Sequence, residues 1–277
     1  MNFIAACNAG VSCKPGIKYN LNKASIHNFI FHNNFILLKY FTTLFLIFSA
    51  VQCAAPNRIN FSKNDFAPNP VVAHRGAWKT KNLPENSIAS LRQAITLGCT
   101  GSEFDVRMTA DDSLIINHDP EYHQLNIEQT SFTALSVFPL SNGEALPTLR
   151  QYILEGLQQN TQTMLVLEIK PSGISKTRAM LIAEKVVKLV AELNAKKMVC
   201  YISFDFDILK KIREIDQRAF LQYLQGDRSP EQLKEARING ADYHFSVFEA
   251  HPDWVERARL NKILVNAWTV NNKEKIE

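Results

Sequence analysis

From about residue 71 onward, the chain alternates between two hydrophobic patterns. Short apolar runs of strand length are followed by segments in which apolar residues recur every three or four positions, as on one face of a helix. The pattern predicts strands that end at His74, Arg107, Lys170, Phe204, Leu224, Val247 and Val270, and helices over 88–97, 149–157, 177–193, 206–215, 230–239 and 254–261. Such alternation indicates a parallel α/β sheet, open or closed.

Polar residues gather where these strands end, which is typical of the active-site face of a (β/α)8 TIM barrel. An open, doubly wound sheet would place its site similarly, but no Gly-rich nucleotide loop follows any strand. We therefore expect the barrel. Only seven barrel strands can be counted, because residues 271–277 hold no further strand. The chain is thus expected to lack the last helix–strand unit, as a fragment or early-terminated form, with unpaired edges on its first and seventh strands.

A hairpin is expected after the second strand. Residues 109–112 separate the run ending at Arg107 from the apolar residues 114–116, and four residues are too few for a parallel crossover. With a turn centred between Asp111 and Asp112, Asp105 would lie opposite His118 at a Cβ separation of roughly 4.5–5.5 Å. Beyond the hairpin, residues 120–138 show no clear period and are expected to form a loop over the site.

Candidate chemistry lies at the ends of the first, second and third strands. Glu103 and Asp105 alternate with apolar residues, so the period of two places both carboxylates on one face. Two acids that face the same way need a bound cation or a basic side chain nearby. The strand over 164–170 carries Glu168 and Lys170 on one face.

Each of these features has an ordinary structural explanation. A lone histidine at a strand end is commonly a hydrogen-bonded structural residue, a Glu-x-Asp pair is commonly a solvated strand face, and Glu168 and Lys170 could form a mutual ion pair. The histidines, the acid pair and a Pro-Glu-Asn-Ser turn at 84–87 nevertheless converge within one short segment, which favours a site.

The first 55 residues differ from the rest. Residues 40–51 form an apolar run, preceded by Lys39 and followed by small residues around Cys53, which is typical of a signal peptide and too short for the ~20 residues of a membrane span. We expect export to the periplasm or cell surface, cleavage close to Cys53, and that cysteine as a candidate lipoprotein anchor. A non-cleaved amphipathic anchor is the alternative, and translation starting near Leu38 would explain the long Asn-rich lead. Residues 56–70 then form a linker and residues 71–277 a barrel domain that is incomplete at its C-terminus.

Charge and cysteine content narrow the class of protein. The net charge of +4 arises from Lys14, Lys18, Lys23 and Lys39, because residues 1–55 hold no acid and the remainder has 27 residues of each sign. A nucleic-acid partner therefore gains no support. Cys99 and Cys200 lie beside predicted strands and are expected to be small buried residues.

The order and spacing of several motifs resemble the glycerophosphodiester phosphodiesterases, from about residue 71 to the end of the chain. The motifs are His74-Arg75-Gly76, Pro84-Glu85-Asn86-Ser87, Glu103-x-Asp105-Val106, Thr109-x-Asp111, His118-Asp119 and Glu168-x-Lys170. The resemblance implies a TIM barrel in which Glu103, Asp105 and Glu168 hold one divalent cation. It also implies that His74 and His118 are the general acid and base, that Arg75 and Lys170 hold the phosphate, and that Trp268 lines the substrate pocket. Family members continue through a further helix and strand, which this chain lacks.

The implied activity is metal-dependent hydrolysis of glycerophosphodiesters to sn-glycerol 3-phosphate and an alcohol. A hard cation such as Ca²⁺ or Mg²⁺ suits carboxylate ligands, whereas Zn²⁺ would favour His or Cys. The nucleophile is either water or a hydroxyl of the substrate's glycerol, and the sequence does not separate the roles of the two histidines. Phospholipase-D-like activity on lysophospholipids or sphingomyelin is an alternative. A non-catalytic barrel surface protein is disfavoured, because both histidines and all three acids are present.

Overall fold

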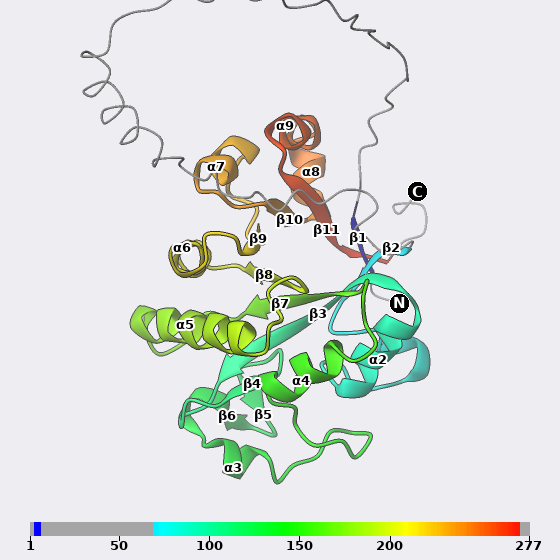
Figure 1. Cartoon of the computed structure of the whole chain (residues 1–277), viewed down its shortest axis with the longest axis vertical. Coiled ribbons are helices and arrows are strands. Elements are labelled where there is room, and N and C mark those ends of the chain that lie inside the picture. Colours follow the sequence, from blue (N-terminus) through cyan, green and yellow to red (C-terminus); the bar gives the residue numbers. More distant parts are fainter. Residues whose placement is uncertain (1–2, 7–68, 272–277) are drawn as a thin grey trace, which may run out of the picture. The chain divides into compact units, whose positions relative to one another are not determined.

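The computed structural model describes residues 3–6 and 69–271 (Figure 1). In chain order the elements are β1 (Phe3–Ala6), β2 (Asn69–Ala73), η2 (Lys79–Lys81), α2 (Ile88–Thr96), β3 (Cys99–Met108), β4 (Leu114–Ile116), β5 (Glu121–Tyr122), β6 (Leu125–Asn126), η3 (Ile127–Gln129), α3 (Phe132–Leu135), α4 (Leu149–Gly156), β7 (Met164–Ile169), α5 (Lys176–Glu192), β8 (Val199–Ser203), α6 (Phe206–Ile215), β9 (Phe220–Tyr223), α7 (Pro230–Glu235), β10 (Gly240–His244), α8 (Phe245–Ala250), α9 (Trp254–Asn261) and β11 (Leu264–Val270). The predicted signal run over 40–51, Cys53 and most of the predicted linker lie outside the described residues.

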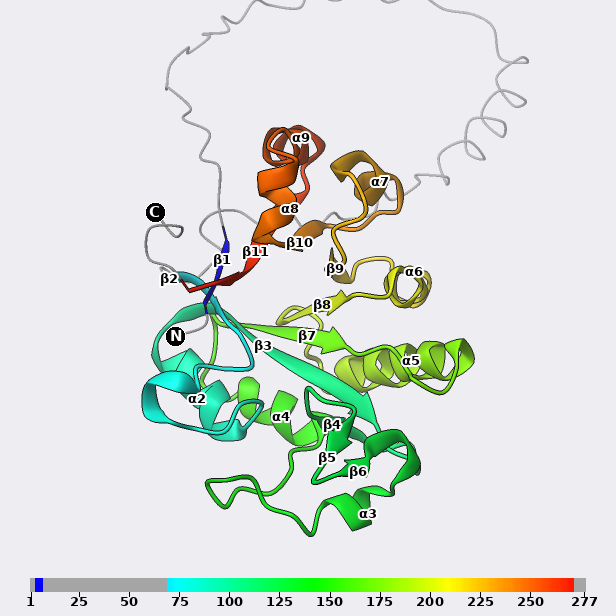
Figure 2. The ribbon, with the colours of Figure 1, turned by 180° about the vertical axis from the view of Figure 1, so that it is seen from behind.

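Seven described strands run parallel in the order β2, β3, β7, β8, β9, β10 and β11. Helices α2, α5, α6, α7 and α9 lie along the connections between them, on the outside of the curved sheet (Figures 1 and 2). The short strand β4 runs antiparallel to β3 and forms the expected hairpin. The predicted barrel architecture, with seven parallel strands and a hairpin after the second, is therefore confirmed.

The gap between the first and last parallel strands is bridged by β1, which pairs antiparallel with both β2 and β11. Phe3 lies opposite Ala73 of β2 and also opposite Val270 of β11. The expectation of unpaired edges was therefore wrong, because the backbone of β1 pairs with both. Nothing in the local hydrophobic pattern had predicted a strand at Phe3–Ala6.

The outer core lies between the sheet and the helices. Buried residues of α5 recur at helical spacing and pack with the outward-facing side chains of β7, as the period of the sequence required: Ala179, Ile182, Ala183, Val186, Val187 and Val190 from α5, and Leu165, Leu167 and Ile169 from β7. Ser175 caps α5 by accepting a hydrogen bond from the Arg178 backbone N–H. Burial of each valine, leucine or isoleucine side chain in this set contributes about 1.5–3 kcal/mol.

The barrel interior is filled by a second apolar cluster. Its buried members are Val72, Met164, Val166, Cys200, Ile202, Phe220 and Leu224. Gly101 of β3 carries no side chain at this level, and a Cβ there would lie 2.8 Å from Cγ2 of Val166. Cys99 and Cys200 are both buried and free, as expected. The packed apolar layer leaves the polar groups of the strands to collect at their carboxyl ends.

Two predicted boundaries in the last third were wrong. The helix predicted over 230–239 ends at Glu235, because Arg237 adopts a left-handed backbone (φ 58°) and the Ile238 N–H returns to the Leu233 carbonyl. The strand predicted to end at Val247 ends at His244, whose side chain accepts from the Ser246 N–H and begins α8. The aromatic and β-branched residues after His244, which had suggested a strand, belong to α8.

The segment over 120–138, which was expected to form a loop over the site, contains the short elements β5, β6, η3 and α3. It has its own buried cluster of Ile115, Tyr122, Ile127, Leu135 and Leu146. Glu128 attaches this segment to the loop after β7, since its Oε2 accepts from the Gly173 N–H at 2.7 Å and its Oε1 lies 3.4 Å from Arg178 Nε. Among the helices of the described ranges, none is both long and apolar enough to cross a membrane.

Candidate active site

The chain reverses sharply after β2, and this turn brings His74 and Arg75 beside β3. Arg75 and Gly76 both have positive φ, at 55° and 78°. The Arg75 N–H donates to Glu103 Oε2 at 2.7 Å, and the Gly76 N–H donates to the Glu103 carbonyl at 3.0 Å. A Cβ on residue 76 would lie 2.3 Å from Ser90 Oγ, so the turn requires glycine for two reasons.

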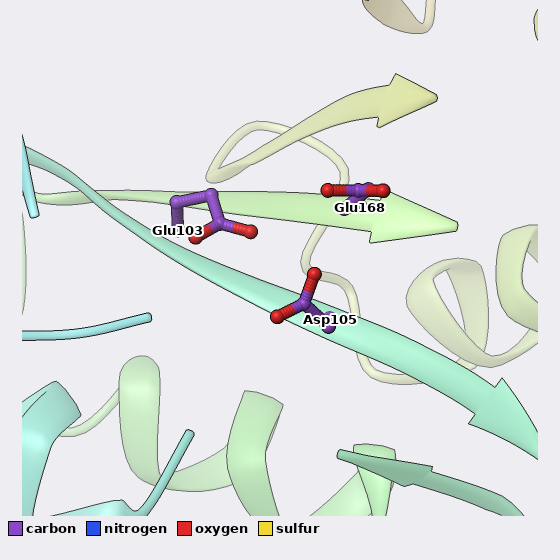
Figure 3. A group of neighbouring side chains, drawn as sticks. All are labelled: Glu103, Asp105 and Glu168. Atoms are coloured by element: carbon purple, nitrogen blue, oxygen red, sulfur yellow. The ribbon is translucent and has the colours of Figure 1, made fainter. Parts of the chain in front are cut away.

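Three carboxylates lie together on the neighbouring strands β3 and β7 (Figure 3). Asp105 and Glu168 are register partners on the two strands, and Glu103 lies two residues before Asp105 on the same face. One oxygen from each acid lies within 4.8 Å of the others, and all three side chains are buried. The structure therefore brings together the three residues that the sequence had suggested as a cation site.

Burial and mutual repulsion strongly perturb these acids. Burial, followed by the charges of Asp105 and Glu168, raises the pKa of Glu103 well above its usual range. The same two causes, burial and then the charge of Asp105, raise the pKa of Glu168 to about 7. Burial is the largest single influence on Asp105 and would raise its pKa, but the charges of Lys170 and His118, together with hydrogen bonds from Lys170 and Asn86, outweigh it and lower that pKa. A site that resists holding three negative charges favours an added positive one.

The donor set fits a hard divalent cation. All three groups offer oxygen, and Glu103 Oε1 is buried with no hydrogen-bond partner. Lys170 Nζ lies 2.9 Å from Asp105 Oδ1 and 2.8 Å from Glu168 Oε1. The ion pair of Glu168 and Lys170 that the sequence left open is thus formed, and it extends to Asp105.

Two residues of the Pro-Glu-Asn-Ser turn hold this site from the side. Asn86 donates from Nδ2 to Asp105 Oδ2 at 2.8 Å and accepts from the Asp105 N–H at 3.2 Å. Glu85 accepts from Arg75 Nη1 at 2.9 and 3.0 Å, while Arg75 Nε lies 4.0 Å from Asp105 Oδ2. Sequence reasoning counted this turn towards a site and among the family motifs, but it assigned no role to Glu85 or Asn86. The available signal was the place of both residues in a motif that the sequence shares with the family.

His74 faces the cluster from the end of β2. Its Nε2 lies 3.9 Å from Glu103 Oε2. Burial lowers the pKa of His74 to about 4, and the charge of Arg75 adds to this effect. The imidazole is therefore neutral near pH 7 and able to accept a proton.

His118 follows β4, and its position corrects the predicted hairpin register by one residue. The observed pairs are Val106 with Ile116 and Met108 with Leu114, so Asp105 lies opposite Asn117 and not His118. The turn holds three residues because the Thr109 N–H donates to the Ser113 carbonyl and Asp112 has a φ of 62°.

The imidazole of His118 is oriented by its chain neighbour. His118 Nδ1 lies 2.7 Å from Asp119 Oδ1, so the Asp119 carboxylate holds one ring nitrogen and leaves Nε2 available.

The far wall of the barrel mouth is aromatic. Trp268 lies on β11, and its Nε1 donates to the Asp242 carbonyl at 2.8 Å. The ring of Phe204 lies 5.6 Å and that of His244 5.2 Å from the Trp268 ring, both edge to face. Sequence reasoning gave Trp268 a role in the substrate pocket but gave none to Phe204 or His244.

Asp242 is a second acid that sequence reasoning missed. It is fully buried on β10 beside Asn266, and burial raises its pKa to about 7.

Comparisons with known proteins show which family the chain is similar to. The sequence profile of the Glycerophosphoryl diester phosphodiesterase family matches residues 74–277. The glycerophosphodiester phosphodiesterase of Caldanaerobacter subterraneus subsp. tengcongensis is 30% identical over 221 residues, which cover 75% of this chain and 88% of the relative. Glycerophosphodiester phosphodiesterase 1 of Bos taurus is 28% identical over 244 residues, covering 72% and 71%.

Solved structures show the same architecture. A glycerophosphodiester phosphodiesterase from Parabacteroides distasonis is 37% identical and covers 74% of this chain and 85% of its own, with a TM-score of 0.71. A phosphodiesterase of Oleispira antarctica in complex with the product sn-glycerol-3-phosphate is 22% identical, with a TM-score of 0.62 and coverage of 73% and 85%, and supports the fold alone. The profile match and the relatives confirm the resemblance seen in the sequence: this chain belongs to the glycerophosphoryl diester phosphodiesterase family.

Proposed function

We propose that this chain hydrolyses glycerophosphodiesters to sn-glycerol 3-phosphate and an alcohol, with one divalent cation, Ca²⁺ or Mg²⁺, on Glu103, Asp105 and Glu168. The observation that carries the proposal is the group of three buried carboxylates, flanked by His74 and by the His118–Asp119 pair, in a chain of this family. A cation held there would neutralise the phosphodiester as the nucleophile approaches it.

The basic side chains at the cluster bind the substrate phosphate in this proposal. Lys170 already lies between two carboxylates, and Arg75 is held by Glu85 at the edge of the same group. A phosphodiester carries one negative charge, so the side chains of Lys170 and Arg75 would both orient it and offset that charge. Trp268 would line the opposite side and pack against the apolar face of the glycerol.

His74 and His118 divide the proton transfers. One removes a proton from the nucleophile, which is water or a neighbouring hydroxyl of the substrate's glycerol, and the other protonates the leaving alcohol oxygen. The Asp119 carboxylate fixes the tautomer of His118, so that Nε2 faces the substrate in one state.

A substrate panel tests the choice of substrate. The full chain is assayed with cation on glycerophosphodiesters of choline, ethanolamine and glycerol, and separately on lysophosphatidylcholine and sphingomyelin. Release of sn-glycerol 3-phosphate from the water-soluble diesters supports the proposal if the two lipids release little choline and sphingomyelin yields little ceramide phosphate. Turnover confined to the two lipids would establish the phospholipase-D-like alternative, and no turnover of either class would favour the non-catalytic one.

The location of the protein is a separate proposal. We infer export to the periplasm or cell surface, with cleavage close to Cys53, a lipid on that cysteine, and membrane contact only through the signal peptide or this anchor. The support is the short apolar run over 40–51 behind Lys39. Sequencing the mature N-terminus from fractionated cells tests it, and a cytoplasmic protein that keeps residues 1–50 would contradict it. Cleavage at this point would also separate β1 from the barrel.

A further inference from the structure

His118 is the first residue after the backbone hydrogen bonds between β3 and the chain beyond β4 come to an end. The last ladder pair of β3 and β4 joins Val106 to Ile116, and one more backbone bond runs from the Asn117 N–H to the Asp105 carbonyl at 3.0 Å. The next residue, His118, therefore needs another group to hold its backbone.

That group is the guanidinium of Arg107. Its Nε donates to the His118 carbonyl at 3.0 Å and its Nη2 donates to the same oxygen at 2.7 Å. Arg107 lies on β3, two residues after Asp105, so the contact connects the backbone of His118 to the strand that carries two of the three clustered acids.

We propose that Arg107 is a positioning residue for catalysis, which fixes the main chain of His118 and thereby the reach of its imidazole. The inference rests on the proposed function, since it gives Arg107 a role only if His118 transfers a proton. Arg107 touches no reacting atom in this account and acts through His118 alone.

The contact is strong for physical reasons. Two N–H groups of one planar, charged fork meet a single carbonyl, and charge-assisted bonds of this kind are short and resist displacement by water. Arginine is protonated at neutral pH, so the guanidinium meets the carbonyl as a charged group.

The two anchors of His118 have different tasks. Asp119 holds the ring through Nδ1, and Arg107 holds the backbone carbonyl. Without Arg107 the imidazole keeps its tautomer, but the backbone of His118 can shift. A misplacement of about 1 Å in a catalytic group costs on the order of 10²-fold in rate.

A purely structural role is separable, because the hairpin has another anchor at its tip. Arg178 of α5 donates to the Thr109 carbonyl at 2.5 Å and to Asp112 Oδ1 at 3.2 Å. It is the same kind of guanidinium-to-carbonyl contact on the same hairpin, but at the end away from His118. Arg178→Gln is therefore the matched control.

The surroundings allow Arg107 to be shortened. A cavity of about 290 Å³ is lined by Arg107 together with Pro120, Glu128 and Pro171, among others. Water from this cavity can occupy the space of a shorter side chain, so Arg107→Gln need not unfold the protein.

The test compares Arg107→Gln, Arg107→Lys and Arg178→Gln in the full chain at saturating cation. We expect kcat of Arg107→Gln to fall about 10–100-fold with KM changed less than threefold. Lysine offers one point donor in place of a fork, so Arg107→Lys should recover part of the rate. Arg178→Gln should lower the melting temperature but keep kcat within threefold of the wild type.

A double-mutant cycle then shows whether the effect passes through His118. In the His118→Ala background, assayed with a p-nitrophenyl phosphodiester, Arg107→Gln should cost no further activity. The inference is overturned if Arg107→Gln keeps the wild-type kcat, if it costs the same factor in both backgrounds, or if Arg178→Gln loses as much rate. If Arg107→Gln fails to fold, the same cycle with Arg107→Lys decides. An inactive wild type would instead refute the proposed function, which separates the two failures.

Discussion

At the scale of single residues, the site depends on backbone conformations that only a few side chains allow. The turn after β2 has two consecutive residues with positive φ, Arg75 and Gly76, and both backbone N–H groups are bonded to Glu103. The motif His-Arg-Gly is therefore a way to bring a histidine and an arginine to one carboxylate. Its glycine has no substitute, because Ser90 of α2 lies where a Cβ would be.

Gly76→Ala should lower the free energy of unfolding by about 2–4 kcal/mol, as overpacking adds to backbone strain. Gly143→Ala is the matched control, because Gly143 also has a positive φ of 85° but a Cβ there meets nothing within 4 Å. Strain alone should cost the control about 1 kcal/mol. Urea denaturation measures both, and equal losses in the two variants would show that Ser90 does not restrict position 76.

Asp242 predicts a pH-dependent stability. Its pKa is raised from 3.8 to about 7, so the folded chain retains a proton that the unfolded chain loses. The stabilisation is complete below about pH 4 and is lost as pH rises through about 7. Asp242→Asn should therefore be the more stable protein above pH 7, by up to about 4 kcal/mol, with the difference shrinking towards pH 4. Melting curves across this range test it, and a difference that does not depend on pH would contradict the assignment.

At the scale of elements, local periodicity sufficed for most of the fold. The apolar residues of α5 recur at the spacing of a helix that is buried on one face. Those of β7 form the continuous run that is typical of a strand buried on both faces. Periodicity could not fix the hairpin register, because the left-handed Asp112 adds a third residue to the turn. Strand ends and motif spacing predicted the three carboxylates, which the structure brings together, and two histidines as further candidates. Asn86, Arg107 and Asp242 were missed, because their roles depend on partners distant in sequence.

Helix α2 offers an element-scale test, since its capping box adjoins Asn86. Ser87 accepts from the Ser90 N–H at the start of α2, and Ser229 accepts from the Gln232 N–H at the start of α7. Each change to alanine should cost about 1 kcal/mol of stability. Only Ser87→Ala should also weaken cation binding, because the Asn86 contact to Asp105 lies beside it. Calorimetric titration with the cation measures the affinity of both variants. Equal affinities would show that the capping box of α2 does not influence the cation site.

At the scale of the whole molecule, the barrel closes through a strand that sequence pattern did not reveal. β1 is antiparallel to both of its neighbours, and its four residues pair with β2 and β11, the first and last strands of the parallel sheet. Such pairing depends on two distant edges that both need a partner, so no local period can predict it.

Ile4→Pro tests this closure without removing a residue. Proline has no N–H, so at position 4 it removes one hydrogen-bond donor from β1. One carbonyl on a neighbouring strand then loses its partner. We expect a loss of about 1–3 kcal/mol in stability and faster aggregation on heating. Asn8→Pro, outside β1, is the control. Identical melting of the two proline variants and the wild type would show that the edges of β2 and β11 do not depend on β1.

The central claim is that a divalent cation on Glu103, Asp105 and Glu168 supports phosphodiester hydrolysis, and ³¹P NMR tests it most directly. The full chain is incubated with sn-glycero-3-phosphocholine in Ca²⁺ or Mg²⁺, then in excess chelator, and then after the cation is restored. The account predicts that the diester signal is replaced by that of sn-glycerol 3-phosphate only while cation is present, and that Glu168→Gln abolishes this conversion. Undiminished conversion in excess chelator, or in Glu168→Gln, would contradict it.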